Sequence, residues 1–227
     1  MLILGIETAL SQGLVFLGEG EKVLTSYRLP AHSSERLAPT IRSLMDEFDV
    51  TFNRLGGVVV SVGPGSFTGI RVGVSLAKSI SYCLKIPLVG VPTLDLLAFA
   101  APCSGVLCSL IEGYGECLFA AFFEKEGDEK PKKKSDYLFL HLEDIVNEAK
   151  KFFPKKVIFV GFSKVSPNIL ETKFQFSLFD APLHLERALL RWGRKNIEAK
   201  ILDDPLILTP IYVSPPRIKK RKDENER

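Results

Sequence analysis

The residues Val58-Val59-Val60-Ser61-Val62 run directly into the segment Gly63-Pro64-Gly65-Ser66-Phe67-Thr68-Gly69-Ile70-Arg71-Val72-Gly73. The apolar run is typical of a buried strand, and the glycine-proline step after it predicts a turn that restarts as a helix. A turn with so little side-chain bulk exposes backbone N–H groups at the helix N-terminus, where the helix dipole favours phosphate or another anion. The first interpretation of this segment is therefore anion binding.

The same helix repeats small residues at one-turn spacing, namely Gly69, Gly73 and Ala77. A glycine inside a helix costs about 0.8 to 1 kcal/mol relative to alanine, so two of them one turn apart indicate that another element needs the space. That element is either an internal neighbour or a partner chain. The segment also lacks the GxxxxGK[ST] pattern that a phosphate-binding P-loop requires. We therefore favour docking through the helix over phosphate binding at the turn.

Strand-like and helix-like segments alternate along the chain, and their order repeats. The first half predicts strands at 2–7, 14–17 and 23–28, a helix near 41–48, and then strand 58–62, helix 68–84, strand 88–91 and helix 94–101. The second half predicts strands at 105–112, 117–123 and 137–140, helix 142–152, strand 156–162, helix 183–201 and a closing strand at 206–213. This alternation favours an α/β fold with two βββαβα halves. We expect subdomains at 1–101 and 102–214 and a disordered charged tail at 215–227.

The composition is that of an ordinary globular protein, with 46% of the 227 residues hydrophobic, 25% charged and a formal net charge of +3. No basic leader precedes the first strand, and no apolar run approaches the roughly 20 residues of a membrane-spanning helix. The four cysteines have no CxxC spacing, so we expect reduced thiols in a cytoplasmic protein and no metal site. We interpret Lys132-Lys133-Lys134 and the basic tail as solvated runs.

Residues that could carry catalysis are sparse. The three histidines, His32, His141 and His184, are far apart in sequence and form no His-x-x-x-His pair. Ser66 lies in GPGSFTG, which is not the GxSxG turn of a hydrolase nucleophile. The sequence therefore predicts neither a zinc hydrolase nor a serine hydrolase.

Two other kinds of site stay open from the residues alone. Glu7 and Glu112 each end a strand that opens a hairpin, and an acid at such a strand end can hold a hydrated cation beside phosphates. An ATP-binding phosphotransferase or ATPase is therefore an alternative function. A second alternative is RNA binding through the basic tail at 217–227 and the helical segment 187–195, in which Trp192 lies among Arg187, Arg191, Arg194 and Lys195.

Several segments, taken together, resemble the TsaB (YeaZ) family. They are Leu4-Gly5-Ile6-Glu7-Thr8-Ala9, the stretch from His32 to Pro39, GPGSFTGIRVG at 63–73, Pro87 with Gly90-Val91-Pro92-Thr93-Leu94, and Pro210-Ile211-Tyr212. The resemblance implies a duplicated actin-like fold, also called RNase H-like or ASKHA. It also implies a protein that assists the ATP-using subunit TsaD in making threonylcarbamoyladenosine beside the tRNA anticodon.

The resemblance further implies a subunit that is not itself catalytic. In the catalytic relative a His-x-x-x-His pair binds the metal, and this chain carries Thr93 and Leu97 at those positions, neither of which is an imidazole ligand. Family members dock through the two helices of the first half, which form a four-helix bundle with TsaD or with a second TsaB copy. The implied interface residues are Gly69, Gly73, Ala77, Ile70, Ile80, Ile41 and Leu44.

The actin-like fold also implies a nucleotide site between the halves, for which the candidate residues are Glu7, Thr8, Gly65, Ser66 and Glu112. Glu7 replaces the commoner aspartate, and the turn after Glu112 lacks the basic residue often found there. We therefore expect no required cofactor, and only weak ATP or ADP binding with Mg²⁺ at the inter-subdomain cleft or the partner interface. The expected partners are TsaD, the ATPase TsaE, tRNA through the complex and, for the isolated chain, a second copy.

Overall fold

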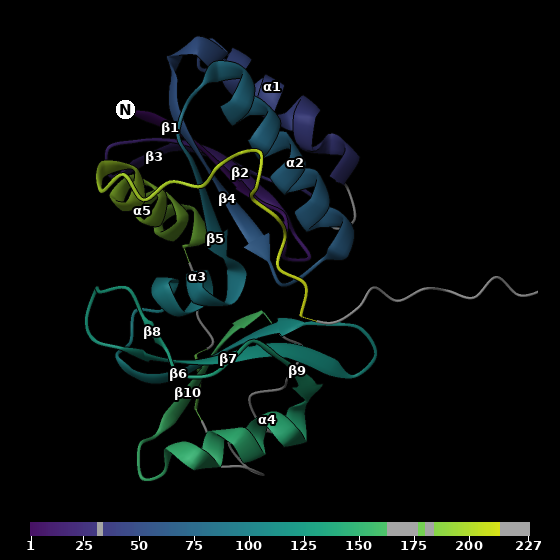
Figure 1. Cartoon of the computed structure of the whole chain (residues 1–227), viewed down its shortest axis with the longest axis vertical. Helices are drawn as coiled ribbons and strands as arrows, with labels where there is room; N and C mark the ends of the chain where they lie inside the picture. The colour runs from purple at the N-terminus through teal and green to yellow at the C-terminus, as the bar shows by residue number, and fades with distance from the viewer. Residues whose placement is uncertain (31–33, 163–176, 180–183, 214–227) are drawn as a thin grey trace, which may run out of the picture.

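The computed structural model describes residues 1–30, 34–162, 177–179 and 184–213. The features predicted at His32, Ser33 and 215–227 lie outside these residues. The described chain forms two sheets whose faces are covered by helices (Figure 1). Within it, no helix is both long and apolar enough to cross a bilayer.

The first sheet has five strands in the order β3-β2-β1-β4-β5. Strand β1 pairs antiparallel with β2 and parallel with β4, so the chain crosses over between β3 and β4 through a helix. The strands are β1 (Leu2–Glu7), β2 (Leu14–Glu19), β3 (Lys22–Arg28), β4 (Leu55–Gly63) and β5 (Leu88–Pro92). The helices of this half are η1 (Ser34–Arg36), α1 (Leu37–Glu47), η2 (Phe52–Arg54), α2 (Phe67–Leu84) and α3 (Thr93–Ala100).

The second sheet has six strands in the order β11-β10-β6-β7-β8, with β9 also paired to β7. Strand β6 pairs antiparallel with β7 and parallel with β10, which repeats the arrangement of β1, β2 and β4 and confirms the predicted α/β class with its duplicated order. The strands are β6 (Gly105–Glu112), β7 (Cys117–Lys125), β8 (Lys132–Lys133), β9 (Leu138–His141), β10 (Val157–Phe162) and β11 (Ser177–Phe179). The helices are α4 (Leu142–Ala149), η3 (Lys150–Phe152) and α5 (Leu185–Glu198).

Three hydrophobic clusters hold these layers together. One joins α1 and α2 to the first sheet, and another joins α4 to the second sheet. The largest lies between the two sheets and contains the apolar residues of α3 and α5. Figure 1 shows α1 and α2 on the outer face of the first sheet, α3 and α5 on its inner face, and α4 beyond the second sheet.

The last helix packs on the first sheet, although chain order places it in the second half. Cβ atoms built on Gly193 of α5 and on Gly57 of β4 would lie 2.8 Å from Val59 and 2.6 Å from Ile197, so these glycines let the helix approach closely. In the middle of the helix the Trp192 ring meets Phe99 of α3 edge-on, with ring centroids 5.3 Å apart. The packing thus divides the molecule differently from the expected segments 1–101 and 102–214.

The predicted closing strand at 206–213 is wrong. Proline has no N–H to donate to a sheet; Pro205 directly precedes this stretch and Pro210 lies within it. Instead, Asp204 closes a turn by accepting from the N–H of Leu206 at 2.7 Å. Residues 199–213, which we call the C-terminal strap, make single backbone hydrogen bonds to the first sheet, including one of 2.8 Å from Ile211 N to Val62 O. The strap therefore crosses the edge of the sheet and ends beside α2 (Figure 1).

Candidate functional site

The glycine turn after β4 is fastened to the end of β1. Gly63 and Gly65 have φ of +96° and +151°, a backbone region that side chains disfavour. A Cβ on Gly65 would overlap the carbonyl oxygen of Ala9, and Ser66 donates its N–H to the same oxygen at 2.7 Å. Ser66 then caps α2, since its Oγ accepts from Gly69 N at 3.2 Å. The turn thus positions α2 against β1.

The small-residue ridge of α2 is occupied by the chain itself. Gly69, Gly73 and Ala77 all face the interior. A Cβ on Gly69 would overlap the carbonyl oxygen of Thr8, and a Cβ on Gly73 would overlap its Oγ1. The predicted use of this ridge as a partner interface is therefore wrong, because the internal neighbour takes the space.

The other implied interface residues also lie inward. Ile70, Ile41 and Leu44 have side chains 1%, 2% and 0% exposed, so a partner could not contact them without disrupting the core. Ile80 is half-buried and packs against the cluster between α1, α2 and the first sheet. Sequence periodicity identifies the apolar face of each helix, and in this fold that face belongs to the core.

The opposite face of α2 is free of such packing. Thr68, Arg71, Ser75, Ser79 and Tyr82 are all exposed. They fall on one side of the helix, opposite the glycine ridge, because they recur three or four residues apart. None of these five residues is among the predicted interface residues, although their spacing of three or four positions is visible in the sequence.

The C-terminal strap reaches one end of this exposed face. The Arg71 guanidinium lies 3.8 Å from the centroid of the Phe67 ring and donates from Nε to the Tyr212 hydroxyl at 3.0 Å. Nearer the middle of the helix, Lys78 Nζ donates to the carbonyl of Leu208 at 2.8 Å. No local sequence signal pairs residues about 140 positions apart, so only the folded chain shows this arrangement.

Glu7 is a buried carboxyl group at the end of β1. Its Oε1 accepts from the N–H groups of Ala9 at 2.7 Å and Leu10 at 3.1 Å, and from the Ser61 hydroxyl at 3.1 Å. The side chain is fully buried, and within the described residues its Oε2 has no hydrogen-bond partner. Burial raises the pKa of Glu7 to about 7, although the three hydrogen bonds act in the opposite direction. The Glu7 side chain therefore stabilises the turn between β1 and β2 by accepting hydrogen bonds from its backbone N–H groups.

A hydrated cation does not fit at Glu7. Magnesium keeps several of its waters when a carboxylate binds it, whereas neither Glu7 nor Thr8 presents an oxygen to solvent, being 0% and 5% exposed. The role of these two residues as nucleotide ligands stays a prediction, which the burial of both side chains does not support. Ser66 is exposed, Gly65 half-buried, and Glu112 half-buried at the end of β6.

The positions that correspond to the histidine pair lie in the core. Thr93 and Leu97 are both in α3 and both 0% exposed. In the described part of the chain, no group of three or more His, Cys, Asp or Glu side chains is placed to hold a metal ion.

The aromatic residue of the basic helix α5, Trp192, is not accessible to a nucleic acid. Trp192 is 5% exposed. Arg194 pairs with Glu21 and Glu198, each at 2.9 Å, and Arg191 pairs with Asp128 at 3.3 Å. Stacking of a base on Trp192 is therefore excluded in this fold, which corrects the alternative based on residues 187–195.

Comparisons with known proteins agree with one another. The family model described as "TsaD: tRNA N6-adenosine threonylcarbamoyltransferase" matches residues 29–186. The tRNA threonylcarbamoyladenosine biosynthesis protein TsaB of Bacillus subtilis (strain 168) is 39% identical over 101 residues, covering 43% of this chain and 44% of that protein. The protein of the same name from Escherichia coli (strain K12) is 28% identical over 131 residues, 56% and 57% of the two chains. The chain thus spans about half the length of the curated relatives it matches.

Solved structures extend the likeness over nearly the whole fold. YeaZ from Pseudomonas aeruginosa superposes with a TM-score of 0.75 at 18% identity, covering 93% of this chain and 99% of that one. A putative N-acetylmannosamine kinase from Listeria monocytogenes gives a TM-score of 0.53 at 8% identity, covering 88% and 100%. Both likenesses concern the fold, and they confirm the duplicated actin-like class.

Proposed function

The chain belongs to the TsaB (YeaZ) family, within the wider family that the threonylcarbamoyltransferase model describes, and we propose that it is a non-catalytic scaffold subunit in tRNA modification. In this proposal it binds and activates a TsaD-type subunit, which threonylcarbamoylates the adenosine next to the anticodon. The names of the relatives support the pathway. The exposed face of α2 supports the mode of action.

That exposed face is the observation that carries the proposal. Ser75 and Ser79 stand one turn apart at its centre, so the backbone of a second helix could approach α2 closely there. Arg71 and Tyr82 at the two ends supply the residue types that dominate binding energy at protein interfaces. With the exposed side of α1 beside it, this surface could form half of a four-helix bundle.

The residues in place of the histidine pair support a non-catalytic role. Thr93 offers a hydroxyl and Leu97 an alkyl group, and both side chains are buried in α3. A metal that binds imidazole nitrogen would find no such ligand at either position. We therefore assign the transfer chemistry to the partner subunit.

The remaining partners follow from the same proposal. A homodimer of the isolated chain would use the α1–α2 face that the TsaD-type subunit later covers, so the two associations would exclude each other. A TsaE-type ATPase and tRNA would then join the cytoplasmic complex of the two subunits. This chain would require no nucleotide of its own, which agrees with the burial of Glu7.

The test is a reconstitution with the TsaD-type and TsaE-type subunits of the same organism. The expected result is a stoichiometric complex of this chain with the TsaD-type subunit, and transfer to a tRNA transcript that depends on both proteins. Full transfer activity in the absence of this chain would contradict the proposal. Tight binding of Mg-ATP to the isolated chain, measured by calorimetry, would instead favour the phosphotransferase alternative.

A further inference from the structure

Two lysine-rich stretches that are separate in sequence meet where β7 ends and β10 begins in the second sheet. The carboxylate of Glu124 on β7 joins them, because its Oε2 lies 2.7 Å from Lys134 Nζ and its Oε1 lies 2.6 Å from Lys155 Nζ. We call the surface around this junction the lysine patch. It is defined by six exposed lysines of the two stretches, Lys132, Lys134, Lys150, Lys151, Lys155 and Lys156, of which Lys134, Lys151 and Lys155 line one hollow with Glu124.

The lysine patch carries an excess of positive charge. Glu124 already pairs with two of its lysines, and Glu148 pairs with Lys151 at 2.6 Å. Glu126 acts on Lys155 from a greater distance. Among the described residues, the six ammonium groups of the patch therefore stand against three carboxylates. A polyanion could therefore bind to these lysines without a rearrangement of the fold.

An exposed aromatic ring stands in the middle of the patch. Phe153 is 87% exposed, the largest exposed fraction among the big apolar side chains of the described chain. Its neighbour Phe152 points inward and stacks on Phe122, with ring centroids 5.0 Å apart, which anchors the turn. Because its ring is exposed, Phe153 does not contribute the about 1.5 to 3 kcal/mol of stability that burial of such a side chain gives. Packing in the core is therefore not the reason for a phenylalanine at this position.

A hollow of about 280 Å³ lies beside this ring. Apolar groups of Val106 and Phe152 line it, together with the carboxylate-bearing side chain of Glu124. An exposed ring next to an apolar hollow can receive a flat heterocycle. A carboxylate on the wall can accept a hydrogen bond from an exocyclic amino group, as acidic side chains do from cytosine.

We propose that the lysine patch and Phe153 bind RNA directly, with the lysines on backbone phosphates and an unpaired base against the Phe153 ring. Lysines that follow a backbone, with an aromatic platform for a base, are the usual combination in single-strand recognition. A membrane surface fits less well, because Phe153 alone would supply the apolar anchor. This inference goes beyond the proposed function, in which tRNA is held only through the complex, and rests on it only for the choice of tRNA as the probe.

The experiment measures binding of the full chain to an unmodified, fluorescently labelled tRNA transcript at several salt concentrations. Phe153→Ala should weaken binding at least about fivefold and leave the salt dependence unchanged, because stacking carries no charge. The double variant Lys132→Gln and Lys156→Gln should lower the slope of log K against log salt by about 2. Glu124→Gln keeps an acceptor oxygen for the base but removes the negative charge beside Lys134 and Lys155, so it should strengthen binding.

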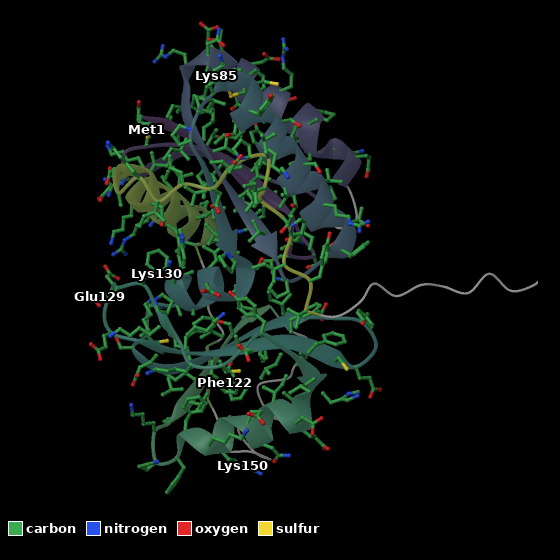
Figure 2. All side chains as sticks on the ribbon, in the orientation of Figure 1. Met1, Lys85, Phe122, Glu129, Lys130 and Lys150 are labelled. Carbon is green, nitrogen blue, oxygen red and sulfur yellow. The ribbon has the colours of Figure 1, made fainter. Side chains whose placement is uncertain are left out.

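Two control variants separate the patch from general effects. Lys85→Gln removes one positive charge at the opposite end of the molecule from Lys150, as Figure 2 shows, and should change tRNA affinity less than the patch variants. Ile207→Ala removes an aliphatic side chain that is 72% exposed, outside the patch. It should leave RNA binding unchanged.

Wild-type tRNA affinity in both the Phe153 and the double-lysine variant would overturn the inference. The inference would also be overturned, in favour of a membrane contact, if the wild type bound anionic phospholipid vesicles and the two patch variants lost that binding but still bound RNA. Thermal unfolding of each variant should match wild type, because the changed side chains lie at the surface. Capture of the TsaD-type subunit should also be unaffected by the patch variants, so failure of RNA binding and failure of the proposed docking give different results.

Discussion

Gly73 of α2 packs against Thr8 at the end of β1 so closely that a Cβ on the glycine would overlap the threonine Oγ1. The next atoms that this Cβ would meet are Thr8 Cβ at 3.3 Å and Ile6 Cγ2 at 3.5 Å. The Thr8 hydroxyl is therefore the one group that a Cβ on Gly73 would overlap. Within the described residues this hydroxyl makes no hydrogen bond, so its removal breaks none of their hydrogen bonds.

The first prediction is a coupled pair of substitutions. Gly73→Ala should destabilise the protein by about 1 to 2 kcal/mol, because overpacking outweighs the better helix propensity of alanine. In a Thr8→Ala background the same change should be neutral or stabilising by up to about 1 kcal/mol, since only helix propensity is left. Denaturant unfolding of the four proteins of the cycle measures the coupling.

Gly69→Ala is the control for this cycle. A Cβ on Gly69 would overlap the backbone oxygen of Thr8, which no substitution at Thr8 removes. Thr8→Ala should therefore fail to rescue Gly69→Ala. Equal rescue of both glycine variants would contradict the assignment of the clash to Oγ1.

The second prediction concerns pH. The pKa of Glu7 is raised from 4.5 to about 7 in the folded protein, so the folded state binds the proton more tightly than the unfolded chain. The stability from this group is fully present below about pH 4.5 and is lost as the pH rises to about 7. The loss amounts to about 3 kcal/mol. Glu7→Gln should flatten this part of the stability profile.

The measurement is the free energy of unfolding of wild type and Glu7→Gln from pH 4 to pH 8. The difference between the two proteins should change by about 3 kcal/mol across this range, in favour of the variant at high pH. Glu116→Gln, at an exposed glutamate, is the control and should follow the wild-type profile. Parallel profiles for wild type and Glu7→Gln would show that Glu7 does not titrate in this window.

The third prediction tests the exposed face of α2. Ser79→Arg places a long charged side chain where a partner helix would approach, and should abolish capture of the TsaD-type subunit without lowering the melting temperature. Asn147→Arg makes a similar change on the exposed side of α4 and should leave capture intact. Capture by the Ser79 variant at wild-type affinity would place the docking surface elsewhere.

The fourth prediction concerns the edge of the first sheet. The Asp203 carboxylate accepts from the N–H of Gly90 on strand β5 at 2.8 Å. Asp203→Ala leaves this half-buried donor without its acceptor and should destabilise the protein by about 1 to 3 kcal/mol. Asp203→Asn keeps an acceptor oxygen for the Gly90 N–H and should lose less stability than Asp203→Ala. Equal losses in the two variants, measured by thermal unfolding, would argue against the hydrogen bond as the cause.

Much of this fold could be predicted because its signals are local. The strand at 58–62, the turn and the helix after it follow from an apolar run, a glycine-proline step and a helical repeat, each visible within about twenty residues. The alternation of strands and helices likewise gives the α/β class, and the 63–73 motif gives the family. The prediction of a closing strand at 206–213 was wrong because single backbone hydrogen bonds to Leu88 and Val62 hold the C-terminal strap, and these do not form the ladder of a strand.

The roles of individual residues depended on contacts between distant parts of the chain. The small residues of α2 already required some element to fill the space beside Gly69 and Gly73, because helical glycines carry an energetic cost. The folded arrangement of the chain then settled that Thr8, some sixty residues earlier, fills this space, and that the Glu7 carboxylate bonds within its own turn. It also decided that Trp192 is buried and that Lys134 and Lys155 meet at Glu124. Helical and strand periods show which face of an element is apolar, whereas the element that covers this face is set by how the layers stack.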